Sequence, residues 1–280
     1  MSSIAKSLRD FLAAAPQSAL AKVVTVKGSA PREQGAWMLV SPDSIFGTIG
    51  GGQLEFMAID KAREMLASAL PAGQTTARRV SLDVPLGPEI GQCCGGWVEV
   101  SIRPVDEKLR AECIASAESD DAGRPHVYLF GGGHVGHALA CALDLLPLHT
   151  VVVETRPDAL DGMPDGVETR LTPVPEEMVR DAPPDSAFVV LTHDHALDFL
   201  IISAALERPD AAYVGMIGSK TKKATFKSWY FREAGGTEAG FARLISPIGG
   251  DAVDDKRPAV IAALAAAEIL TALAASRGGD

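Results

Sequence analysis

The chain has 280 residues, a length that suits one large domain or two ordinary ones. Hydrophobic residues make up 47% of it and charged residues 22%, so a globular core is expected. The net charge of −10 and the pI near 5.1 disfavour a binder of nucleic acid or of anionic membranes, because both need a basic surface. The aromatic content of 5% also makes a surface that stacks bases unlikely. We therefore expect neither a nucleic-acid partner nor a membrane partner.

The first 104 residues are predicted to form a small α+β domain. An amphipathic helix is expected over 4–14. Its apolar part is too short and too interrupted for a signal peptide, which favours a cytoplasmic protein. Alternating apolar residues and turn signals then predict several strands and a second helix. The predicted strands are 20–27, 36–40, 44–48, 77–82 and 97–103, and the predicted helix is 53–69.

Two adjacent cysteines, Cys93 and Cys94, stand between glycines in the turn-rich loop 85–96 of this domain. Glycine on both sides leaves a thiol accessible, so one interpretation is a thiolate that meets a soft metal or a sulfur-bearing ligand. The alternatives are two small buried residues or a strained vicinal disulfide. The remaining cysteines, Cys113 and Cys141, fall in predicted helices, and no C-x-x-C pair indicates a zinc site. A reducing compartment is expected.

A run of three glycines, Gly50, Gly51 and Gly52, precedes the predicted helix 53–69. A glycine-rich turn that opens a helix can bind an anion, because the first turn has free N–H groups and the positive end of the helix dipole. The alternative is a flexible connection between a strand and a helix. Both interpretations remain open at this point.

Residues 105–125 are predicted to be a polar helix, 105–119, followed by a charged, glycine-containing linker, 120–125. The domain boundary falls there, and 126–280 form the second domain. Alternating strands and helices predict an α/β fold, with a Rossmann-like, doubly wound sheet of five parallel strands. The predicted strands are 127–130, 150–153, 169–174, 188–191 and 211–215, and the predicted helices are 138–146, 175–181, 196–206, 220–234 and a buried, alanine-rich 259–275.

The first strand of this domain leads into Gly131, Gly133 and Gly136, which have the G-x-G-x-x-G spacing. Such glycines permit a tight turn, close approach of a ligand and close contact of helix with strand, and the helix start can receive a phosphate. His134 lies inside this loop and is expected near the ligand. Glu154 ends the second strand, where an acid can accept hydrogen bonds from a ribose or another polar ring. Because such folds host many ligands, the motif by itself does not identify NAD.

More polar residues follow other predicted strands, and the carboxyl ends of parallel strands meet at one edge of a sheet. The cations can neutralise a phosphate, and the glycine–serine pair can present N–H groups at another helix start. The histidine and aspartate can bind a ligand or move protons near neutral pH, although the aspartate could instead cap the helix that follows. These residues are Arg156, His193, Asp194, Gly218, Ser219 and Lys220.

The order of these motifs resembles the xanthine dehydrogenase accessory proteins, the XdhC and CoxI-like family, over nearly the whole chain. Any one match would be a weak signal, but so many in one order are specific. The matching segments are 28–32 with 35–36, 47–55, 91–96, 130–136, 191–198, 214–220 and 246–249.

This resemblance implies a chaperone of the molybdenum cofactor rather than an enzyme. Such a protein binds the molybdopterin form, protects it while a cysteine desulfurase helps to install the terminal sulfido ligand, and delivers it to xanthine dehydrogenase or a related molybdenum hydroxylase. A homodimer is compatible with that role. The Cys-Gly-Gly motif of the family falls on Cys94, with Cys93 beside it, as the candidate contacts to molybdenum.

The parts of molybdopterin can be matched to the remaining motifs. Either glycine turn, 50–52 or 131–136, would suit the phosphate, and Glu55, Glu154 and Asp194 would suit the N–H groups of the pterin. The alternatives are an NAD(P)-dependent oxidoreductase that uses the same glycine loop, and a nucleotide-sensing Rossmann protein. An oxidoreductase is supported by Glu154, but the chain shows no obvious tyrosine–lysine or serine–lysine catalytic pair.

Overall fold

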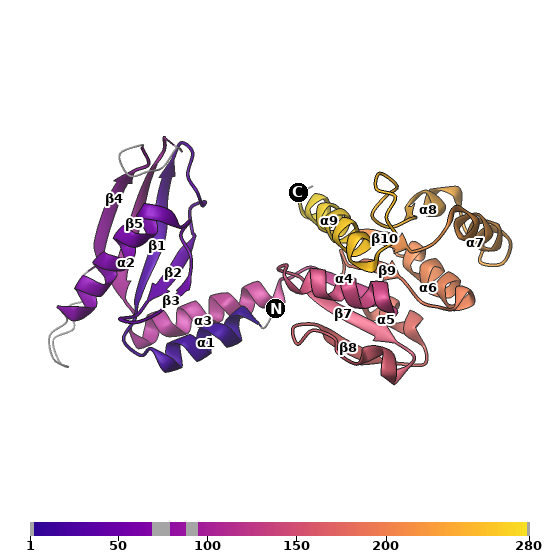
Figure 1. The fold of residues 1–280 in the computed structure, drawn as a ribbon, viewed down its shortest axis with the longest axis horizontal. Coiled ribbons are helices and arrows are strands. Elements are labelled where there is room, and N and C mark those ends of the chain that lie inside the picture. Colours follow the sequence, from indigo (N-terminus) through magenta and orange to yellow (C-terminus); the bar gives the residue numbers. More distant parts are fainter. Residues whose placement is uncertain (1–2, 69–78, 88–94, 279–280) are drawn as a thin grey trace. The chain divides into compact units, whose positions relative to one another are not determined.

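The computed structural model of the protein describes residues 3–68, 79–87 and 95–278. The chain forms two compact units, Ser3–Ala122 and Gly123–Asp280, and each has its own sheet. Figure 1 labels the helices and strands of both units.

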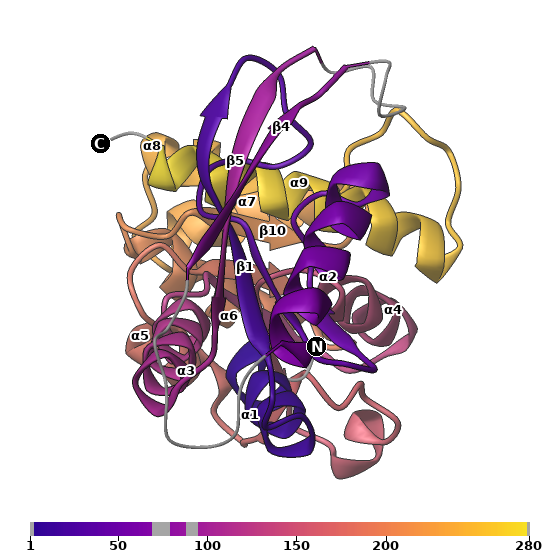
Figure 2. The same ribbon diagram turned by 90° about the vertical axis from the view of Figure 1, so that its left-hand side faces the viewer.

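The N-terminal unit is built on a five-stranded antiparallel sheet in the order β3-β2-β1-β5-β4 (Figure 2). Its strands are β1 (Ala19–Lys27), β2 (Trp37–Val40), β3 (Ile45–Gly47), β4 (Val80–Pro85) and β5 (Trp97–Pro104). The strand expected over 77–82 extends further than predicted, because β4 pairs with β5 as far as Pro85. Residues 77 and 78 lie outside the described part of the chain.

Helices cover both faces of this sheet. Neighbouring side chains of a strand point to opposite faces, and both faces carry apolar side chains that the helices bury. Ala19, Ala21 and Val23 of β1 are buried with residues of α2 (Gly52–Ala67). Leu20 points the other way and packs in a second cluster with α1 (Ile4–Ala14) and α3 (Glu107–Ala122). Figures 1 and 2 show α1 and α3 side by side.

The linker predicted over 120–125 is wrong for its first three residues, which are the last residues of α3. Asp121 explains the difference. Its carboxylate accepts hydrogen bonds from the N–H groups of Ile4 (3.2 Å) and Ala5 (3.0 Å) at the start of α1. A negative charge there satisfies free N–H groups and the helix dipole. The acidic run therefore belongs to the packing of α3 against α1.

The C-terminal unit is a six-stranded parallel sheet in the order β8-β7-β6-β9-β10-β11. The chain begins in the middle at β6, winds out to β8, returns to β9 beside β6 and winds out in the other direction. This is the doubly wound Rossmann arrangement that the sequence predicted. The strands are β6 (His126–Phe130), β7 (His149–Glu154), β8 (Glu168–Leu171), β9 (Ala187–Val190), β10 (Tyr213–Met216) and β11 (Leu244–Ile245).

The sixth strand, β11, corrects the prediction of five. It has two residues and follows the short helix α8 (Glu238–Ala242). Two residues are too few to show the alternation by which a strand is recognised. Only pairing with β10, which aligns Val214 with Leu244, makes this segment a strand.

Two layers of helices bury the two faces of the parallel sheet (Figure 1). One face is covered by α4 (His134–Asp144) and α9 (Pro258–Arg277). The other is covered by α5 (Pro175–Asp181), α6 (His195–Glu207) and α7 (Lys220–Arg232). Strands buried on both faces read as continuous apolar runs, which is why β9 and its neighbours were recognisable.

The C-terminal helix, α9, has Pro258 in its first turn, as expected, but only one of its faces is buried. Ala265 and Ile269 are fully buried, whereas Leu270 is 38% exposed. Glu268 is the acid within this apolar helix, and its carboxylate accepts a hydrogen bond from the Tyr213 hydroxyl (2.5 Å). By length and composition alone, α9 is the one helix in the described residues that could span a membrane.

Candidate functional site

The candidate site lies where β6 and β9 separate, at their carboxyl ends. Neighbouring strands are followed there by connections that leave in opposite directions, and ligands of open α/β sheets bind at such switch points. Backbone bonds hold the two loops: Gly131 donates to the Val153 carbonyl (2.9 Å) and Leu191 donates to the Phe130 carbonyl (2.8 Å). The loop after β6 with the start of α4, residues 131–136, therefore faces the loop after β9 with the start of α6, residues 191–195.

The three glycines within residues 131–136 differ in their surroundings. Gly131 has a φ of +120°, and a Cβ at this position would lie 2.7 Å from the Leu191 carbonyl oxygen. A Cβ at Gly136 would lie 2.0 Å from the Gly131 carbonyl oxygen, so helix and loop touch there. Gly133 has an ordinary φ of −66° and open space where a Cβ would stand. Two glycines thus serve packing, and the third leaves room beside the start of α4.

These different surroundings predict unequal results for two alanine substitutions. Gly136→Ala should destabilise the C-terminal unit by about 3 kcal/mol, because overpacking forces backbone shifts. Gly133→Ala should cost about 1 kcal/mol or less, since its φ suits alanine and its surroundings are open, and alanine is only a poorer N-cap of α4 than glycine. Urea unfolding of the two variants checks this. Equal stabilities would contradict the tight contact between α4 and Gly131.

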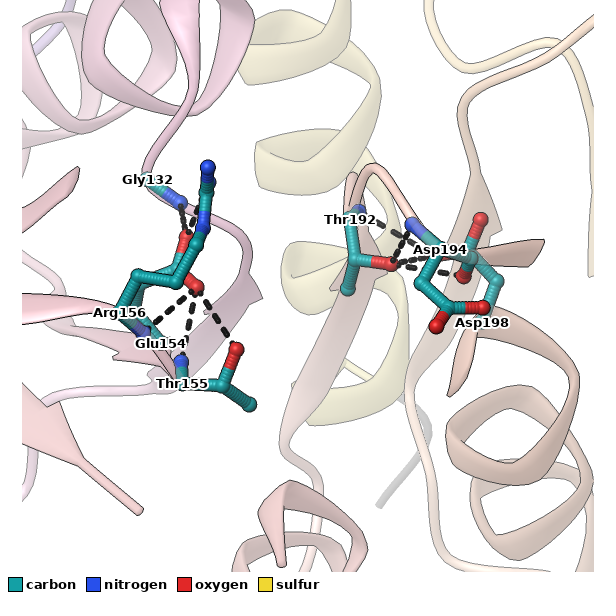
Figure 3. A network of polar contacts seen from close by, with 7 residues as sticks. All are labelled: Gly132, Glu154, Thr155, Arg156, Thr192, Asp194 and Asp198. Carbon is teal, nitrogen blue, oxygen red and sulfur yellow. Dashed lines mark hydrogen bonds and ion pairs between the residues drawn. The ribbon is translucent and has the colours of Figure 1, made fainter. Parts of the chain in front are cut away.

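Glu154 is 5% exposed and ends β7, as predicted, but it binds the protein itself (Figure 3). One carboxylate oxygen accepts from the Gly132 N–H (3.0 Å) and the Arg156 guanidinium (3.2 Å). The other accepts from the Thr155 N–H (2.8 Å), the Thr155 hydroxyl (3.2 Å) and the Arg156 N–H (3.2 Å). Burial alone would raise the pKa of this carboxyl, but the hydrogen bonds, led by that from Gly132, outweigh it and lower the pKa to about 2.

This network changes the role expected of Glu154. Two carboxylate oxygens have about four good acceptor positions, and five donors already point at them. The hydroxyls of a ribose could bind this carboxylate only if some of its hydrogen bonds to the protein were broken. Arg156 keeps capacity for an anion, because its side chain is 43% exposed and its guanidinium binds Glu154 through one terminal nitrogen, Nη2.

A second polar network holds the loop after β9 (Figure 3). Asp198 is fully buried on α6, and its Oδ1 accepts from the Thr192 N–H (3.2 Å) and hydroxyl (2.7 Å). Its Oδ2 forms an ion pair with the Lys222 ammonium group, which is 8% exposed. Lys222 also donates to the Ile217 carbonyl (3.0 Å), so one ion pair joins the loops that follow β9 and β10.

Sequence reasoning missed Asp198 and Lys222 as site residues. Asp198 matched a segment of the family resemblance, but nothing local distinguishes it from an exposed acid on a helix. Lys222 stands in a lysine-rich run with Lys220 and Lys223, and the sequence does not say which of them is buried. Only the fold brings these two charges together.

The other predicted residues of this edge have simpler surroundings. Asp194 caps α6 by accepting from the Ala196 N–H (2.8 Å), so the capping alternative describes what its carboxylate does. Ser219 caps α7 and accepts from the Lys222 N–H (3.3 Å). Gly218, with a φ of +156°, lies against the Lys222 side chain. The side chains of His134, His193 and Lys220 are among those exposed at this edge.

The N-terminal unit brings together the motifs that carried the resemblance in its half of the chain. A Cβ on Gly50 would lie 2.7 Å from the Pro31 ring, and one on Gly96 would lie 2.1 Å from the Ser29 carbonyl oxygen. Ser29 also forms a backbone bridge with Gly95. The segments 28–32, 47–55 and 95–96 therefore meet in one place. Cys93 and Cys94, the candidate metal contacts, lie outside the described residues.

The glycine turn at Gly50–Gly52, one of the two predicted anion-binding sites, already binds a carboxylate of the chain itself. Glu55 Oε2 accepts from the N–H groups of Ile49 (3.1 Å) and Gly51 (3.0 Å) and from the Thr48 hydroxyl (2.6 Å). Glu55 is thereby bound to its own loop, and a phosphate there would meet its negative charge. Of the two glycine turns, the one at Gly133 is the better phosphate site.

Within residues 3–68, 79–87 and 95–278, no group of three or more histidine, cysteine, aspartate or glutamate side chains is arranged to hold a metal ion. His134 and His137, one turn apart on α4, thus have no third ligand among the described residues.

The fold and the glycine loop at its switch point define a Rossmann-type α/β protein with a second, antiparallel domain. Residues 127–269 match the model of the XdhC Rossmann domain, and residues 11–78 match that of the XdhC and CoxI family. The chain belongs to the XdhC and CoxI family.

Two known proteins are similar over almost the whole chain. The Escherichia coli K12 protein described as uncharacterized protein YqeB is 29% identical over 271 residues, which are 93% of this chain and 44% of that protein. The chain thus spans less than half of that relative's length. A crystal structure from Bacillus halodurans described as a xanthine dehydrogenase matches with a TM-score of 0.79 at 19% identity, over 98% of this chain and 96% of that one. At that identity the likeness is one of fold.

Proposed function

We propose that this protein binds the molybdenum cofactor in its molybdopterin form, protects it during sulfuration and delivers it to xanthine dehydrogenase or a related molybdenum hydroxylase. One observation favours this over a dinucleotide enzyme. The glycine loop keeps an open place for a phosphate at Gly133, while Glu154, the acid that a ribose would need, is saturated by the protein itself. A ligand that has a phosphate but needs no carboxylate for a ribose fits both the open space at Gly133 and the saturated Glu154.

The phosphate would bind at the start of α4. Gly133 leaves space there, the first N–H groups of a helix have no partner within the helix, and the partly exposed guanidinium of Arg156 lies beside the loop, on the Glu154 oxygen that also binds the Gly132 N–H. His134, His193 and Lys220 are exposed at the same edge of the sheet and are the candidates for contacts to the pterin.

The metal end of the cargo would meet Cys94 or Cys93. A thiolate is the form of cysteine that binds metals, and adjacent glycines favour access. The sulfur would come from a cysteine desulfurase, so the protein would be a carrier rather than an enzyme. We expect it to act in the cytoplasm, and a homodimer is the assembly to look for.

The test is to measure the pterin that copurifies with the protein. Oxidation of a preparation from a cofactor-producing host converts bound molybdopterin to a fluorescent pterin. We expect roughly equimolar pterin in the wild type, a loss of at least about tenfold in Cys93→Ala/Cys94→Ala, and no loss in Cys141→Ala, which removes an exposed cysteine of α4. Wild-type protein without pterin affinity would refute the proposal.

The alternative, an NAD(P)-dependent oxidoreductase, is tested with the same samples. Titration with NADH, followed by its fluorescence, should show no saturable binding, because the carboxylate that would bind its ribose, Glu154, is already occupied. Saturable binding that survives replacement of both cysteines would instead make the glycine loop an ordinary dinucleotide site.

A further inference from the structure

A groove is lined by residues of α5, α6 and α7, a helix layer in which α6 contacts both α5 and α7. Its volume is about 290 Å³, which is room for one or two large side chains. Every lining residue belongs to the C-terminal unit, and none belongs to the glycine loop or to the two networks of the candidate site. The groove therefore requires an explanation of its own.

The apolar part of the groove comes from α6 and α7. Leu200, Ser203, Ala204 and Glu207 recur at the spacing of one helix face, so they line the groove together. The two small residues form the hollow, and Leu200 is 48% exposed beside it. Trp229 of α7 packs one part of its surface on Phe199, with ring centroids 5.6 Å apart, and also lines the groove.

The polar part of the groove is acidic. Glu176 comes from α5, Glu207 from α6 and Glu233 from the end of α7. None of these three has an ion pair within the described part of the chain, and the basic residue in the lining is Arg180. Three carboxylates against one guanidinium leave the groove with a net negative charge next to an exposed leucine and a partly buried tryptophan.

We propose that the α5–α6–α7 groove docks an amphipathic helix of a partner protein, one that carries lysine or arginine beside leucine-type anchors. Helices bind in apolar grooves through residues spaced i, i+3, i+4 and i+7, and the small side chains of Ser203 and Ala204 allow close approach. Cationic residues next to those anchors would pair with the free glutamates, whereas an acidic segment would be repelled. This inference does not depend on the nature of the cargo.

The probe for this surface is a fluorescein-labelled synthetic helix with leucines at the i, i+3, i+4 and i+7 spacing and lysines at the flanking positions. A matched probe has glutamate in place of every lysine. Fluorescence anisotropy with the full-length protein should show saturable binding of the lysine peptide and at least about tenfold weaker binding of the glutamate peptide.

Two variants and two controls locate the binding. Leu200→Ser and Glu207→Gln/Glu233→Gln should each weaken binding of the lysine peptide by about fivefold or more. Leu270→Ser removes another exposed leucine, on α9, and Glu33→Gln/Asp43→Asn removes the same charge from the N-terminal unit. Both should change affinity by less than about twofold. Failure to bind the lysine peptide at about 1 mM, or equal affinities for groove and control variants, would overturn the proposal.

Discussion

Replacing Glu154 with glutamine is expected to lower the free energy of unfolding of the C-terminal unit by about 3 kcal/mol at neutral pH. The carboxylate is 5% exposed and joins the glycine loop to the end of β7 through Gly132 and Arg156. A glutamine keeps one acceptor oxygen and places an NH₂ group against donors. Buried donors left unpaired, with the loss of the negative charge beside Arg156, make the substitution costly.

The contribution of Glu154 should also depend on pH. The pKa is depressed from 4.5 to about 2 in the folded state, and each pKa unit corresponds to about 1.4 kcal/mol. Because the folded pKa is the lower one, the stabilisation is complete above the unfolded value of 4.5 and is lost as the pH falls toward about 2. The wild type should therefore lose about 3 kcal/mol more than Glu154→Gln between about pH 6 and pH 2.

Trp229 allows this measurement on the C-terminal unit alone. The three tryptophans of the chain are Trp37, Trp97 and Trp229, and the last lies in that unit, so urea unfolding can be followed by its fluorescence in a Trp37→Phe/Trp97→Phe background. Glu176→Gln, which removes a carboxylate of α5 that has no ion pair in the described part of the chain, is the matched control and should change stability by less than about 0.5 kcal/mol. A Glu154→Gln variant as stable as this control would show that the network contributes nothing.

The second large effect is expected at the buried ion pair. Lys222→Met should destabilise the C-terminal unit by about 3–5 kcal/mol, because it leaves the charge of Asp198 buried without its cation. Asp198 would keep the two hydrogen bonds from Thr192 but lose its partner on α7. Lys223→Met, which removes a partly buried neighbouring lysine, should cost about 1 kcal/mol or less.

A double-mutant cycle distinguishes this pairing from a general effect of lysine removal. Asp198→Asn alone leaves the Lys222 ammonium group buried with the Ile217 carbonyl as its hydrogen-bond partner. The double variant Asp198→Asn/Lys222→Met should be more stable than the sum of the two single effects predicts, by about 2 kcal/mol or more, because neither charge is then left alone. Additive effects in urea unfolding would mean that the two charges do not stabilise each other.

Most of the fold was predictable because its signals are local. The strand, glycine turn and helix from β6 to α4 could be identified from adjacent residues, and so could the short helix α5 with its opening proline. The errors in the predicted secondary structure fall where a contact with a distant segment of the chain determines the conformation. β11 is a strand through its pairing with β10, and residues 120–122 are helical because Asp121 caps α1.

The candidate site divides in the same way. Sequence spacing identified Gly131, Gly133 and Gly136, and the order of motifs identified the family. The sequence could not tell which of these glycines is open to a ligand. The contact between Gly136 and Gly131, and the open space beside Gly133, exist only when α4 is packed on the sheet.

By itself, the sequence determined the two-domain organisation, the Rossmann-like class of the second domain and the family, since periodicity and motif order are properties of neighbouring residues. The tertiary structure decided which charges are free. Glu154 looks like a ribose ligand in the sequence, yet the folded loop surrounds it with donors. Asp198 and Lys222 look like surface charges, yet they meet in the core, because pairing depends on which chain segments the sheet brings together.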